Sequence, residues 1–554
     1  MRLAPSSSLL TLALCALPLT ACDGGTESTT GNTGGTGGTG GTTTTTTTTE
    51  EITDIDYAPL GAVSGTEGKG SFRFGAASAA TQIEDQNPTT DWYIWTLPKD
   101  QGGLGKDTFV GDAAKGYTLT DTDIDLLVEM GLDSYRFSIE WARVEPEKDN
   151  IDEAALQHYS DFIDALIAKG IRPMVTIHHF SNPLWIDDPR DPTCANGPTD
   201  QNLCGWNHPE GGPQVVEQLA QHTKLLAERF GDRVDDWCTL NEPVNYLLAG
   251  YGIGNFPPGK AGILGNITED FIPAVRNFMA AHAAMYDALK SADTTDADGD
   301  GIAASVGFTK EAGEWVAADD NEISESPADV KARDGVLWVY QYLFAEAFMQ
   351  GGFDTDLNGD LDEPHPEWKG KLDWMGVQYY FRAGVTGSPG LLPLVGATPC
   401  FGTFDLGACL PPLDPTYRVE AMDYEHHPQG LYTVLADFGS RWPDLPLTVT
   451  ESGIATTVGP RRAEVIVRAL ESIERARKEG VDVRGYYHWS LTDNFEWALG
   501  YTPRFGLYTV DYNDPNYKRT ATLGATVLGD IAKSRKLSIQ QRKDYGGEGP
   551  MTPE

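Results

Sequence analysis

Apolar residues follow two alternating patterns along most of the chain, short continuous runs and longer amphipathic stretches. The stretch at 153–169 is the clearest helix, because its apolar residues return every three or four positions and Gly170 follows it. A second helix is predicted over 215–229, and a helix start at 120–123. The short runs predict eight strands, at 72–80, 134–139, 174–177, 234–240, 303–308, 372–379, 447–450 and 483–489.

The order of these elements predicts the fold class. Strands that alternate with helices are typical of parallel sheets, and eight such units predict a single α/β domain, a (β/α)₈ TIM barrel with long βα loops, over residues 70–535. A doubly wound open sheet is the alternative. It would place a Gly-rich phosphate turn after the first strand, and the residues at 74–78 do not form one.

The N-terminal segment has the pattern of an export signal. A basic Arg2 and an apolar run at 9–19 predict a signal peptide over residues 1–21. It ends Leu19-Thr20-Ala21-Cys22, which resembles the lipobox of bacterial lipoproteins and implies lipidation of Cys22. An ordinary signal peptide with a chance cysteine is the alternative. With lipidation, we expect an exported protein anchored in the lipid of the bacterial cell envelope, periplasmic or at the surface.

Both ends of the chain beyond the predicted barrel are polar. Residues 24–50 are almost entirely Gly and Thr, including eight consecutive Thr at 42–49. Because such a composition buries no apolar surface, a disordered tether is predicted over residues 22–60. A polar C-terminal tail is predicted over residues 536–554.

The net charge of the chain limits which kinds of molecule it can bind. Asp and Glu outnumber Lys and Arg by 81 to 41, for a formal net charge of −40. A surface this negative repels phosphate backbones, so no nucleic-acid partner is expected. No run of 18 apolar residues occurs, which excludes a membrane-spanning helix, so a membrane partner would be reached through the acylated cysteine alone.

Cysteine spacing fits an oxidising compartment. Cys194 and Cys204 lie in one turn-rich stretch and Cys400 and Cys409 in another, and each pair can close a surface loop as a disulfide. Cys238 lies within an apolar strand and is predicted to be a free, buried thiol.

Two of the predicted strands end in glutamate, Glu242 after one and Glu451 after the other. The carboxyl ends of barrel strands meet at one rim, where partial dehydration raises carboxyl pKa values and drives them apart. Two facing carboxyls about 5–5.5 Å apart suit retaining glycosidic cleavage, in which one protonates the leaving oxygen and the other attacks the anomeric carbon. Taken singly, either residue could be a solvated rim group.

The motifs around these glutamates make the resemblance specific. The sequence Thr239-Leu240-Asn241-Glu242-Pro243 is similar to the acid/base motif of family-1 glycoside hydrolases, the β-glucosidase and β-glycosidase family. Thr450-Glu451-Ser452-Gly453 is similar to the nucleophile motif of that family, with Ser452 in place of Asn. Further agreement lies at 74–84, 135–139 and 488–497, so the resemblance covers residues from about 72 to about 528.

The resemblance implies a retaining, exo-acting β-glycosidase, a β-glucosidase above all, acting on neutral β-glycosides or oligosaccharides without a cofactor. It implies Glu451 as nucleophile and Glu242 as acid/base, with Arg136 holding Glu451 ionised. The residues implied to bind the substrate are Gln82, His179, Asn241, Tyr380, Trp489, Glu496 and Trp497. Without the family context, His179, Trp489 and Arg136 would equally suit ordinary packing and ion-pairing roles.

The chain departs from the family pattern in places, most clearly in Gln378 where Asn is usual; the longer side chain is expected to reposition a hydrogen bond near the acid/base. Three alternatives remain at this point. A transglycosidase would share the site, a carbohydrate-binding lipoprotein would lack turnover, and a 6-phospho-glycosidase is disfavoured because Glu496 would repel phosphate.

One acidic loop has the spacing of a calcium site. Oxygen-bearing side chains alternate at 354–360 with Gly359 at the turn, as in the first half of an EF-hand loop, but His365 takes the place of the usual bidentate Glu. A structural calcium is one interpretation and an acidic surface turn the other; 296–301 is a similar, shorter loop. The candidate ligands are Asp354, Asp356, Asn358 and Asp360.

Overall fold

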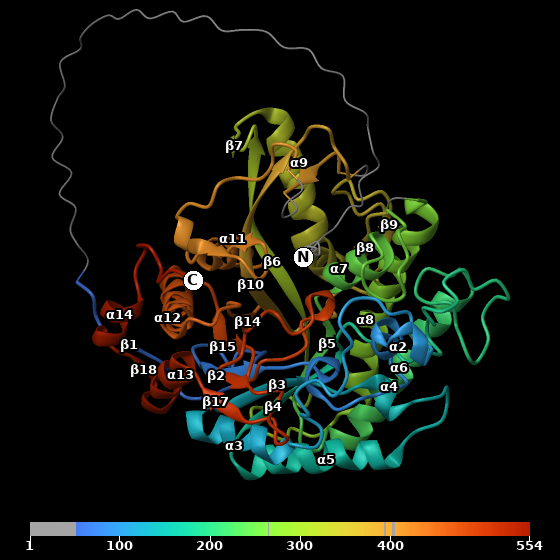
Figure 1. The fold of residues 1–554 in the computed structure, drawn as a ribbon, viewed down its shortest axis with the longest axis horizontal. Helices are drawn as coiled ribbons and strands as arrows, with labels where there is room; N and C mark the ends of the chain where they lie inside the picture. The colour runs from blue at the N-terminus through green and yellow to red at the C-terminus, as the bar shows by residue number, and fades with distance from the viewer. Residues whose placement is uncertain (1–50, 264, 393–394, 401–404) are drawn as a thin grey trace, which may run out of the picture.

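A computed structural model describes residues 51–263, 265–392, 395–400 and 405–554. Eight parallel strands close into a barrel in the order β2–β3–β4–β5–β6–β10–β14–β15, and β15 pairs with β2 (Figure 1). This confirms the predicted (β/α)₈ barrel and all eight predicted strands. The barrel strands are β2 (Arg73–Ala77), β3 (Ser134–Ser138), β4 (Arg172–His178), β5 (Asp236–Asn241), β6 (Ser305–Asp319), β10 (Trp374–Thr386), β14 (Leu447–Ser452) and β15 (Val483–Trp489).

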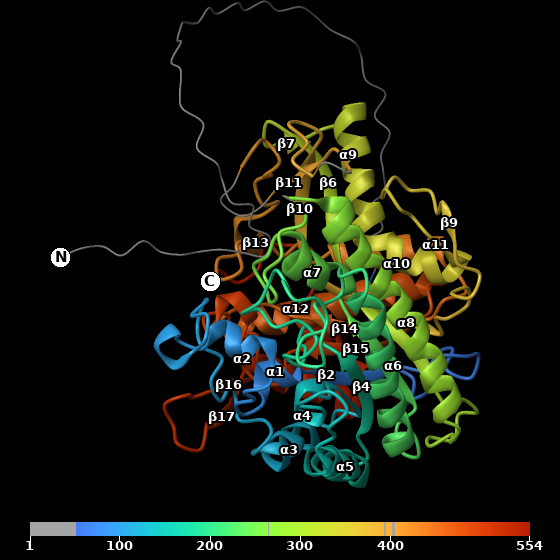
Figure 2. The same cartoon turned by 90° about the vertical axis from the view of Figure 1, so that its right-hand side faces the viewer.

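Amphipathic helices surround the barrel. The helix predicted over 153–169 is α5 (Glu153–Ala168), which buries its apolar side and is capped by Asp152. The helix predicted over 215–229 is α6 (Gly211–Phe230), which lies beside α8 (Ile272–Ala292) along the barrel wall (Figure 2). The other long helices of the described residues are α3 (Thr120–Met130), α9 (Pro327–Leu337), α11 (Gly430–Arg441), α12 (Gly459–Lys478) and α13 (Leu523–Ser534).

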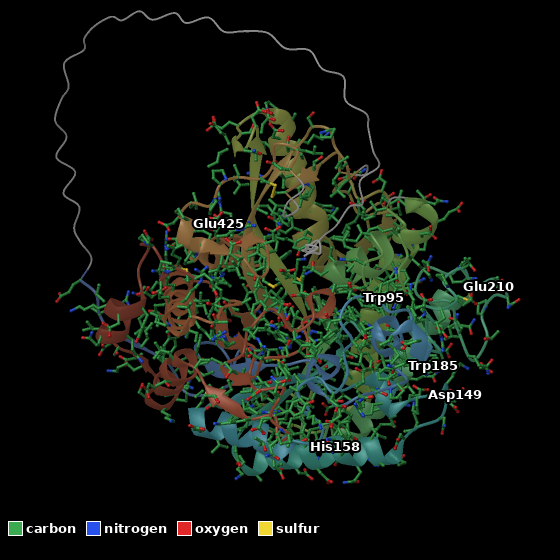
Figure 3. The ribbon with its side chains drawn as sticks, in the orientation of Figure 1. Trp95, Asp149, His158, Trp185, Glu210 and Glu425 are labelled. Atoms are coloured by element: carbon green, nitrogen blue, oxygen red, sulfur yellow. A yellow bond between two sulfur atoms is a disulfide. The ribbon has the colours of Figure 1, made fainter. Side chains whose placement is uncertain are left out.

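Two barrel strands are much longer than the rest. β6 has 15 residues and β10 has 13, and they stay paired as they run past the barrel toward α9 (Figure 2). Short strands border this extension: β7 (Glu322–Ile323), β11 (Thr398–Pro399), β12 (Arg418–Val419) and β13 (Tyr424–Glu425). Arg382 of β10 pairs with Glu425 of β13 at 2.7 Å, and Glu425 lies beside the extension (Figure 3). The extension therefore builds one wall of the space above the carboxyl ends of the strands.

The amino end of the barrel is closed by the segment before β2. Val63 packs with Met174, Cys238, Trp374 and Tyr487 in a small cluster inside the barrel. The carbonyl of Gly61 accepts hydrogen bonds from Arg73 and Arg172, at 2.6 and 2.9 Å, and both arginines begin barrel strands. This segment is the floor of the barrel, at the end opposite to the carboxyl ends of the strands.

The predicted tether over 22–60 extends too far into the chain. Ile55–Asp56 forms strand β1, which pairs with β18 (Lys536–Leu537), and Ile55 and Tyr57 are buried. Isolated apolar residues in a polar stretch gave no periodic pattern, and only pairing with a distant strand buries them. Cys22 and the rest of residues 1–50 lie outside the described part of the chain.

The predicted polar tail over 536–554 is also folded in the structure. It contains β18 and α14 (Ile539–Tyr545), which begins with a capping box at Ser538. Beyond it, Arg468 of α12 donates hydrogen bonds to the carbonyls of Gly549 and Pro550, and Met551 is buried. Side chains of α12 hold the backbone of this segment, so it folds without an apolar periodicity of its own. The sequence pattern therefore resembled that of a tail.

The predicted cysteine chemistry is confirmed. Cys194 and Cys204 form one disulfide, Cys400 and Cys409 form another, and Cys238 is a free, buried thiol. Within the described ranges, no helix combines the length and the hydrophobicity needed to cross a bilayer.

The remaining helices and strands are short. The helices are α1 (Ala80–Ile83), α2 (Asp91–Thr96), α4 (Trp141–Val144), α7 (Pro243–Leu247) and α10 (Leu343–Glu346), and the strands are β8 (Gly352–Phe353), β9 (Glu363–Pro364), β16 (Tyr508–Val510) and β17 (Arg519–Ala521).

Candidate active site

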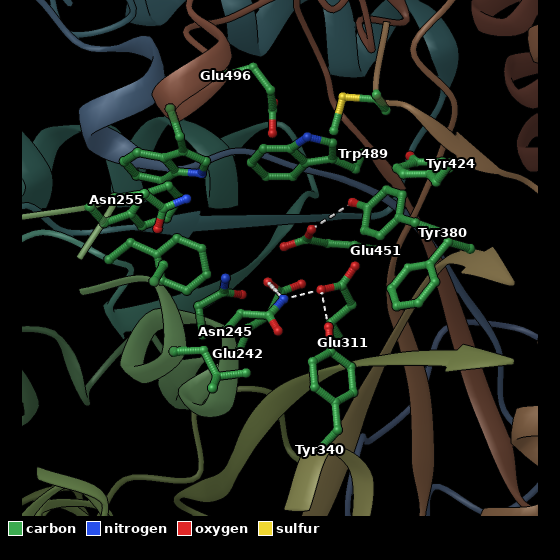
Figure 4. A pocket seen from close by; sticks show the side chains of 18 of the residues that line it. Glu242, Asn245, Asn255, Glu311, Tyr340, Tyr380, Tyr424, Glu451, Trp489 and Glu496 are labelled. Carbon is green, nitrogen blue, oxygen red and sulfur yellow. Dashed lines mark hydrogen bonds between the residues drawn. The ribbon is translucent and has the colours of Figure 1, made fainter. Parts of the chain in front are cut away.

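Glu242 and Glu451 lie in one pocket at the carboxyl ends of the barrel strands (Figure 4). Glu451 belongs to the end of β14, and Glu242 turns the chain from β5 into α7. Their exposed fractions are only 8% and 4% for Glu242 and Glu451, so both carboxyls are largely dehydrated. Glu242 has a left-handed backbone with φ 39°, a conformation that costs energy for a non-glycine residue and is concentrated at functional sites.

Two donors hold the Glu451 carboxylate. Arg136 of β3 donates from Nη1 to Oε1 of Glu451 at 2.5 Å, and the Tyr380 hydroxyl of β10 donates to Oε2 at 2.7 Å. Burial raises the pKa of Glu451, and the Arg136 charge and the Tyr380 hydrogen bond oppose that rise. Glu451 is thus the carboxyl of the pair whose ionised form the pocket favours, and it is fixed in one orientation.

Glu242 has the opposite environment. Burial raises its pKa well above the ordinary range, and the negative charges of Glu311 and Glu451 raise it further. The side-chain donor to its carboxyl is the amide of Asn245, at 2.9 Å from Oε2. The pocket therefore favours the protonated form of Glu242 beside an ionised Glu451.

The residues expected to bind the substrate line the same pocket. They are Gln82, His179, Asn241, Tyr380, Trp489, Glu496 and Trp497. Arg136 contacts this group of residues as well, because its Nη2 donates a hydrogen bond to Oδ1 of Asn241 at 2.6 Å. All the sequence-predicted residues of this site are therefore brought together.

Five buried polar atoms of pocket-lining residues have no hydrogen-bond partner among the described residues: Oε1 of Gln82, Nδ1 of His179, Oδ1 of Asn255, Nε1 of Trp315 and the hydroxyl of Tyr424. The Nε2 atom of His179 lies 3.1 Å from the amide nitrogen of Asn241, so Nε2 is the acceptor and Nδ1 carries the proton. A buried polar group without a partner costs about 1–3 kcal/mol. Donors and acceptors without partners, in a pocket with aromatic side chains, suit a ligand that carries hydroxyl groups.

Glu496 is held next to Gln82, with Nε2 of Gln82 3.4 Å from its Oε2. Burial, and then the charge of Glu451, raise the pKa of Glu496 to about 8. A protonated carboxyl both donates and accepts hydrogen bonds, which again suits hydroxyl groups.

Gln378, which stands where the family usually has Asn, hydrogen-bonds to the residue before the acid/base. Its Nε2 donates to Oδ1 of Asn241 at 2.9 Å and lies 3.2 Å from Oγ1 of Thr309. The Oδ1 atom of Asn241, the neighbour of Glu242, therefore accepts hydrogen bonds from both Gln378 and Arg136.

The pocket also contains residues that the sequence analysis missed. Glu311 of β6 lies beside Glu242, and both share the amide of Asn245 (Figure 4). Tyr340 donates a hydrogen bond to Glu311 at 2.6 Å. A signal was present, because Glu311 follows an apolar strand just as Glu242 and Glu451 do. Apolar residues also line the pocket, among them Leu248, Ile253, Phe256, Trp315, Phe381 and Met422.

The candidate calcium loop does not gather its ligands. Asp354 is buried, and its carboxylate accepts hydrogen bonds from Trp338 and from the backbone of Asn358 and Gly359. The described residues contain one group of three carboxylates close enough to share an ion, Asp235 with Asp296 and Asp298, and it lacks Asp354, Asp356 and Asp360. The side chains of the loop at 354–360 therefore serve its own backbone, as in a surface turn.

A (β/α)₈ barrel with a hydroxyl-binding pocket and two carboxyls in opposed environments defines the class of glycoside hydrolases. Comparison with known proteins gives the family. The sequence profile of Glycosyl hydrolase family 1 matches residues 67–537, so the chain belongs to this family and is a retaining glycoside hydrolase.

The relatives agree with this assignment. The chain is 30% identical over 487 residues to a β-galactosidase of Pyrococcus woesei, covering 79% of this chain and 92% of that protein. The structure of a β-glycosidase from Pyrococcus horikoshii superposes with a TM-score of 0.70 at 28% identity, covering 88% of this chain and 100% of that one. A rice β-glucosidase mutant in a covalent complex with glucose has a TM-score of 0.68 at 27% identity, covering 83% and 97%.

Proposed function

We propose that the protein is an exo-acting β-glucosidase that hydrolyses terminal, non-reducing β-linked sugars by double displacement. One observation carries the proposal: two buried carboxyls share a pocket, and one has a cation and a hydroxyl donor while the other has negative neighbours. Environments that drive two carboxyl pKa values apart assign one as nucleophile and the other as acid.

In the first step, the Glu451 carboxylate attacks the anomeric carbon while Glu242 gives its proton to the leaving oxygen. Arg136 and Tyr380 hold the attacking group in place. In the second step, Glu242, now ionised, takes a proton from water as the water displaces Glu451. The two carboxyls supply acid, base and nucleophile, so the reaction requires no cofactor.

The proposed substrate is a neutral sugar joined to an aglycone. Gln82, His179 and Glu496 offer hydrogen bonds to sugar hydroxyls, and Trp489 lines the pocket beside them. Glu496 supplies no positive charge for a phosphate group and would repel one when ionised above its pKa of about 8, which disfavours 6-phospho-glycosides. The apolar residues of the pocket favour an aglycone with apolar surface.

The test is the stereochemistry of the wild-type reaction. Hydrolysis of an aryl β-glucoside, followed by NMR, should show β-glucose as the first-formed anomer, and among aryl β-glycosides the glucoside should react fastest. A first-formed α-anomer would rule out double displacement. Transfer of the sugar to added acceptor in preference to water would identify a transglycosidase on the same site.

We further propose that acylation of Cys22 anchors the enzyme to the lipid of the cell envelope. Acyl chains supply strong membrane affinity to a chain as acidic as this one. The segment that leads into the barrel reaches it at the floor, through Gly61 and Val63. An anchor at this end would leave the pocket, at the opposite end, free to receive substrate.

A further inference from the structure

A third buried carboxyl belongs to the wall of the pocket. Glu311 lies on β6 two positions after Thr309, whose carbonyl accepts a hydrogen bond from the backbone N–H of Glu242 at 3.0 Å. This pairing sets Glu311 beside the proposed acid/base. Its exposed fraction is 8%, the same as that of Glu242, so water screens the two charges little.

The Asn245 amide links the two carboxyls. Its Nδ2 donates to Oε2 of Glu242 at 2.9 Å and also to Oε2 of Glu311 (Figure 4). Glu311 has a second donor in the Tyr340 hydroxyl, at 2.6 Å from the same oxygen. Donors fixed on a carboxylate favour its ionised form. Burial raises the pKa of both carboxyls, but two donors oppose the rise at Glu311.

The other charged and titratable groups around Glu242 come from β6 itself and from several further elements. Arg136 of β3 is committed to Glu451 and Asn241, and the burial of His179 after β4 lowers its pKa well below the ordinary range, which leaves it neutral. Lys310 of β6 donates to the carbonyl of Tyr340, and burial lowers its pKa to about 7. The remaining groups are Glu451 of β14, Tyr380 of β10, Tyr340 and Glu496. The charges that act most strongly on Glu242 are thus the negative ones of Glu311 and Glu451.

We propose that Glu311 is a positioning residue that keeps Glu242 protonated in the free enzyme, through its charge and through the shared Asn245 amide. This inference rests on the proposed function. When two carboxyls lie side by side, ionising both is unfavourable, and the one with more fixed donors keeps the charge. The Glu242 proton moves to the leaving oxygen as the glycosidic bond breaks and Glu451 bonds to the anomeric carbon; Glu311 neither gives nor takes a proton.

The arrangement also accounts for the change of role between the two steps. Formation of the glycosyl ester removes the negative charge of Glu451, so the pKa of Glu242 falls and it becomes able to act as a base. The negative charge of Glu311 remains through both steps. It therefore sets the pH above which Glu242 loses its proton and can no longer act as the acid of the first step.

The test is the pH profile of Glu311→Gln. Removing the negative charge lowers the pKa of Glu242, so the acid form is lost at lower pH. For a β-glucoside with a poor leaving group, the alkaline limb of kcat/KM should move down by about one pH unit. For a 2,4-dinitrophenyl β-glucoside, which hardly needs an acid, kcat/KM should change less than about threefold.

Two further variants complete the experiment. Glu311→Asp retains the negative charge, so the alkaline limb of its kcat/KM profile should lie close to the wild-type pH. Glu314→Gln makes the same chemical change on the same strand at a carboxylate that pairs with His427, and it should leave the limb unmoved. An unmoved limb in Glu311→Gln, or an equal loss on both substrates at every pH, would overturn the role of Glu311. If Glu242→Gln itself spares the poor substrate, the proposed function fails instead.

Discussion

At the scale of single residues, the arginine Arg136 orients two polar side chains of the site. Arg136 holds Glu451 with Nη1 and Asn241 with Nη2, so the nucleophile and the neighbour of the acid/base are fixed by one guanidinium. A planar fork of this kind has no equivalent in lysine, whose ammonium is a single point charge.

We predict that Arg136→Gln shifts the acid limb of kcat/KM to higher pH and lowers kcat/KM at least about 100-fold. Loss of the cation raises the pKa of Glu451, so a higher pH is needed to ionise it. A pH profile with an activated aryl glycoside measures both effects. Arg382→Gln, which removes another buried arginine and its Glu425 pair, should leave the acid limb in place; a shift there, or none in Arg136→Gln, would contradict the assignment.

The candidate site could be predicted from the sequence because its residues adjoin distinctive motifs. Glu242 and Glu451 end apolar strands within recognisable family segments. Glu311 follows the predicted apolar run at 303–308, but no motif surrounds it, and its importance depends on Asn245, which approaches from α7. A contact made across elements leaves no local pattern in the sequence.

At the scale of elements, the barrel was predictable because continuous apolar runs are typical of parallel strands buried on both faces. The lengths of β6 and β10 were not predictable, since their outer halves include charged residues, as at 314, 319 and 382. These halves form strands because they pair with each other beyond the barrel.

The floor of the barrel contains a buried ion pair that the pattern of apolar runs could not reveal. Arg73 of β2 and Asp236 of β5 bond to each other with side chains exposed by only 1% and 2%. We predict that Arg73→Met costs about 3–5 kcal/mol of unfolding free energy, because it leaves Asp236 buried without a partner.

Urea unfolding measures this cost. Replacing both residues, Arg73→Met with Asp236→Leu, should cost less than the single change, since no charge is then left unpaired. Lys536→Met, which breaks a pair at the surface, should cost no more than about 1 kcal/mol. An Arg73→Met protein as stable as the Lys536→Met protein would show that the pair contributes little.

At the scale of the whole molecule, two strands near the ends of the described chain, β1 and β18, meet away from the pocket. β1 and β18 pair beside α13, and the floor segment leads from β1 into the barrel. The sequence placed both stretches outside the domain because their burial depends on contacts more than 450 positions apart, such as Ile55 with Leu537.

We predict that Cys22→Ser releases the protein from the membrane fraction, because acylation of this residue is the proposed source of membrane affinity. Fractionation followed by a high-salt wash measures the release. Cys15→Ser is the matched control, since it alters the predicted signal segment but not the proposed acylation site, and it should still sediment with membranes. Sedimentation of Cys22→Ser after the wash would refute the anchor.

The central claim is the division of roles between Glu451 and Glu242, and azide rescue of the two alanine variants tests it most directly. In Glu242→Ala, an activated aryl β-glucoside still forms the glycosyl ester on Glu451, and azide displaces it to give the β-glycosyl azide. In Glu451→Ala, azide occupies the place of the missing carboxylate and attacks the substrate itself, which gives the α-azide. NMR of the two products decides between the roles, and the opposite pair of anomers would contradict the account.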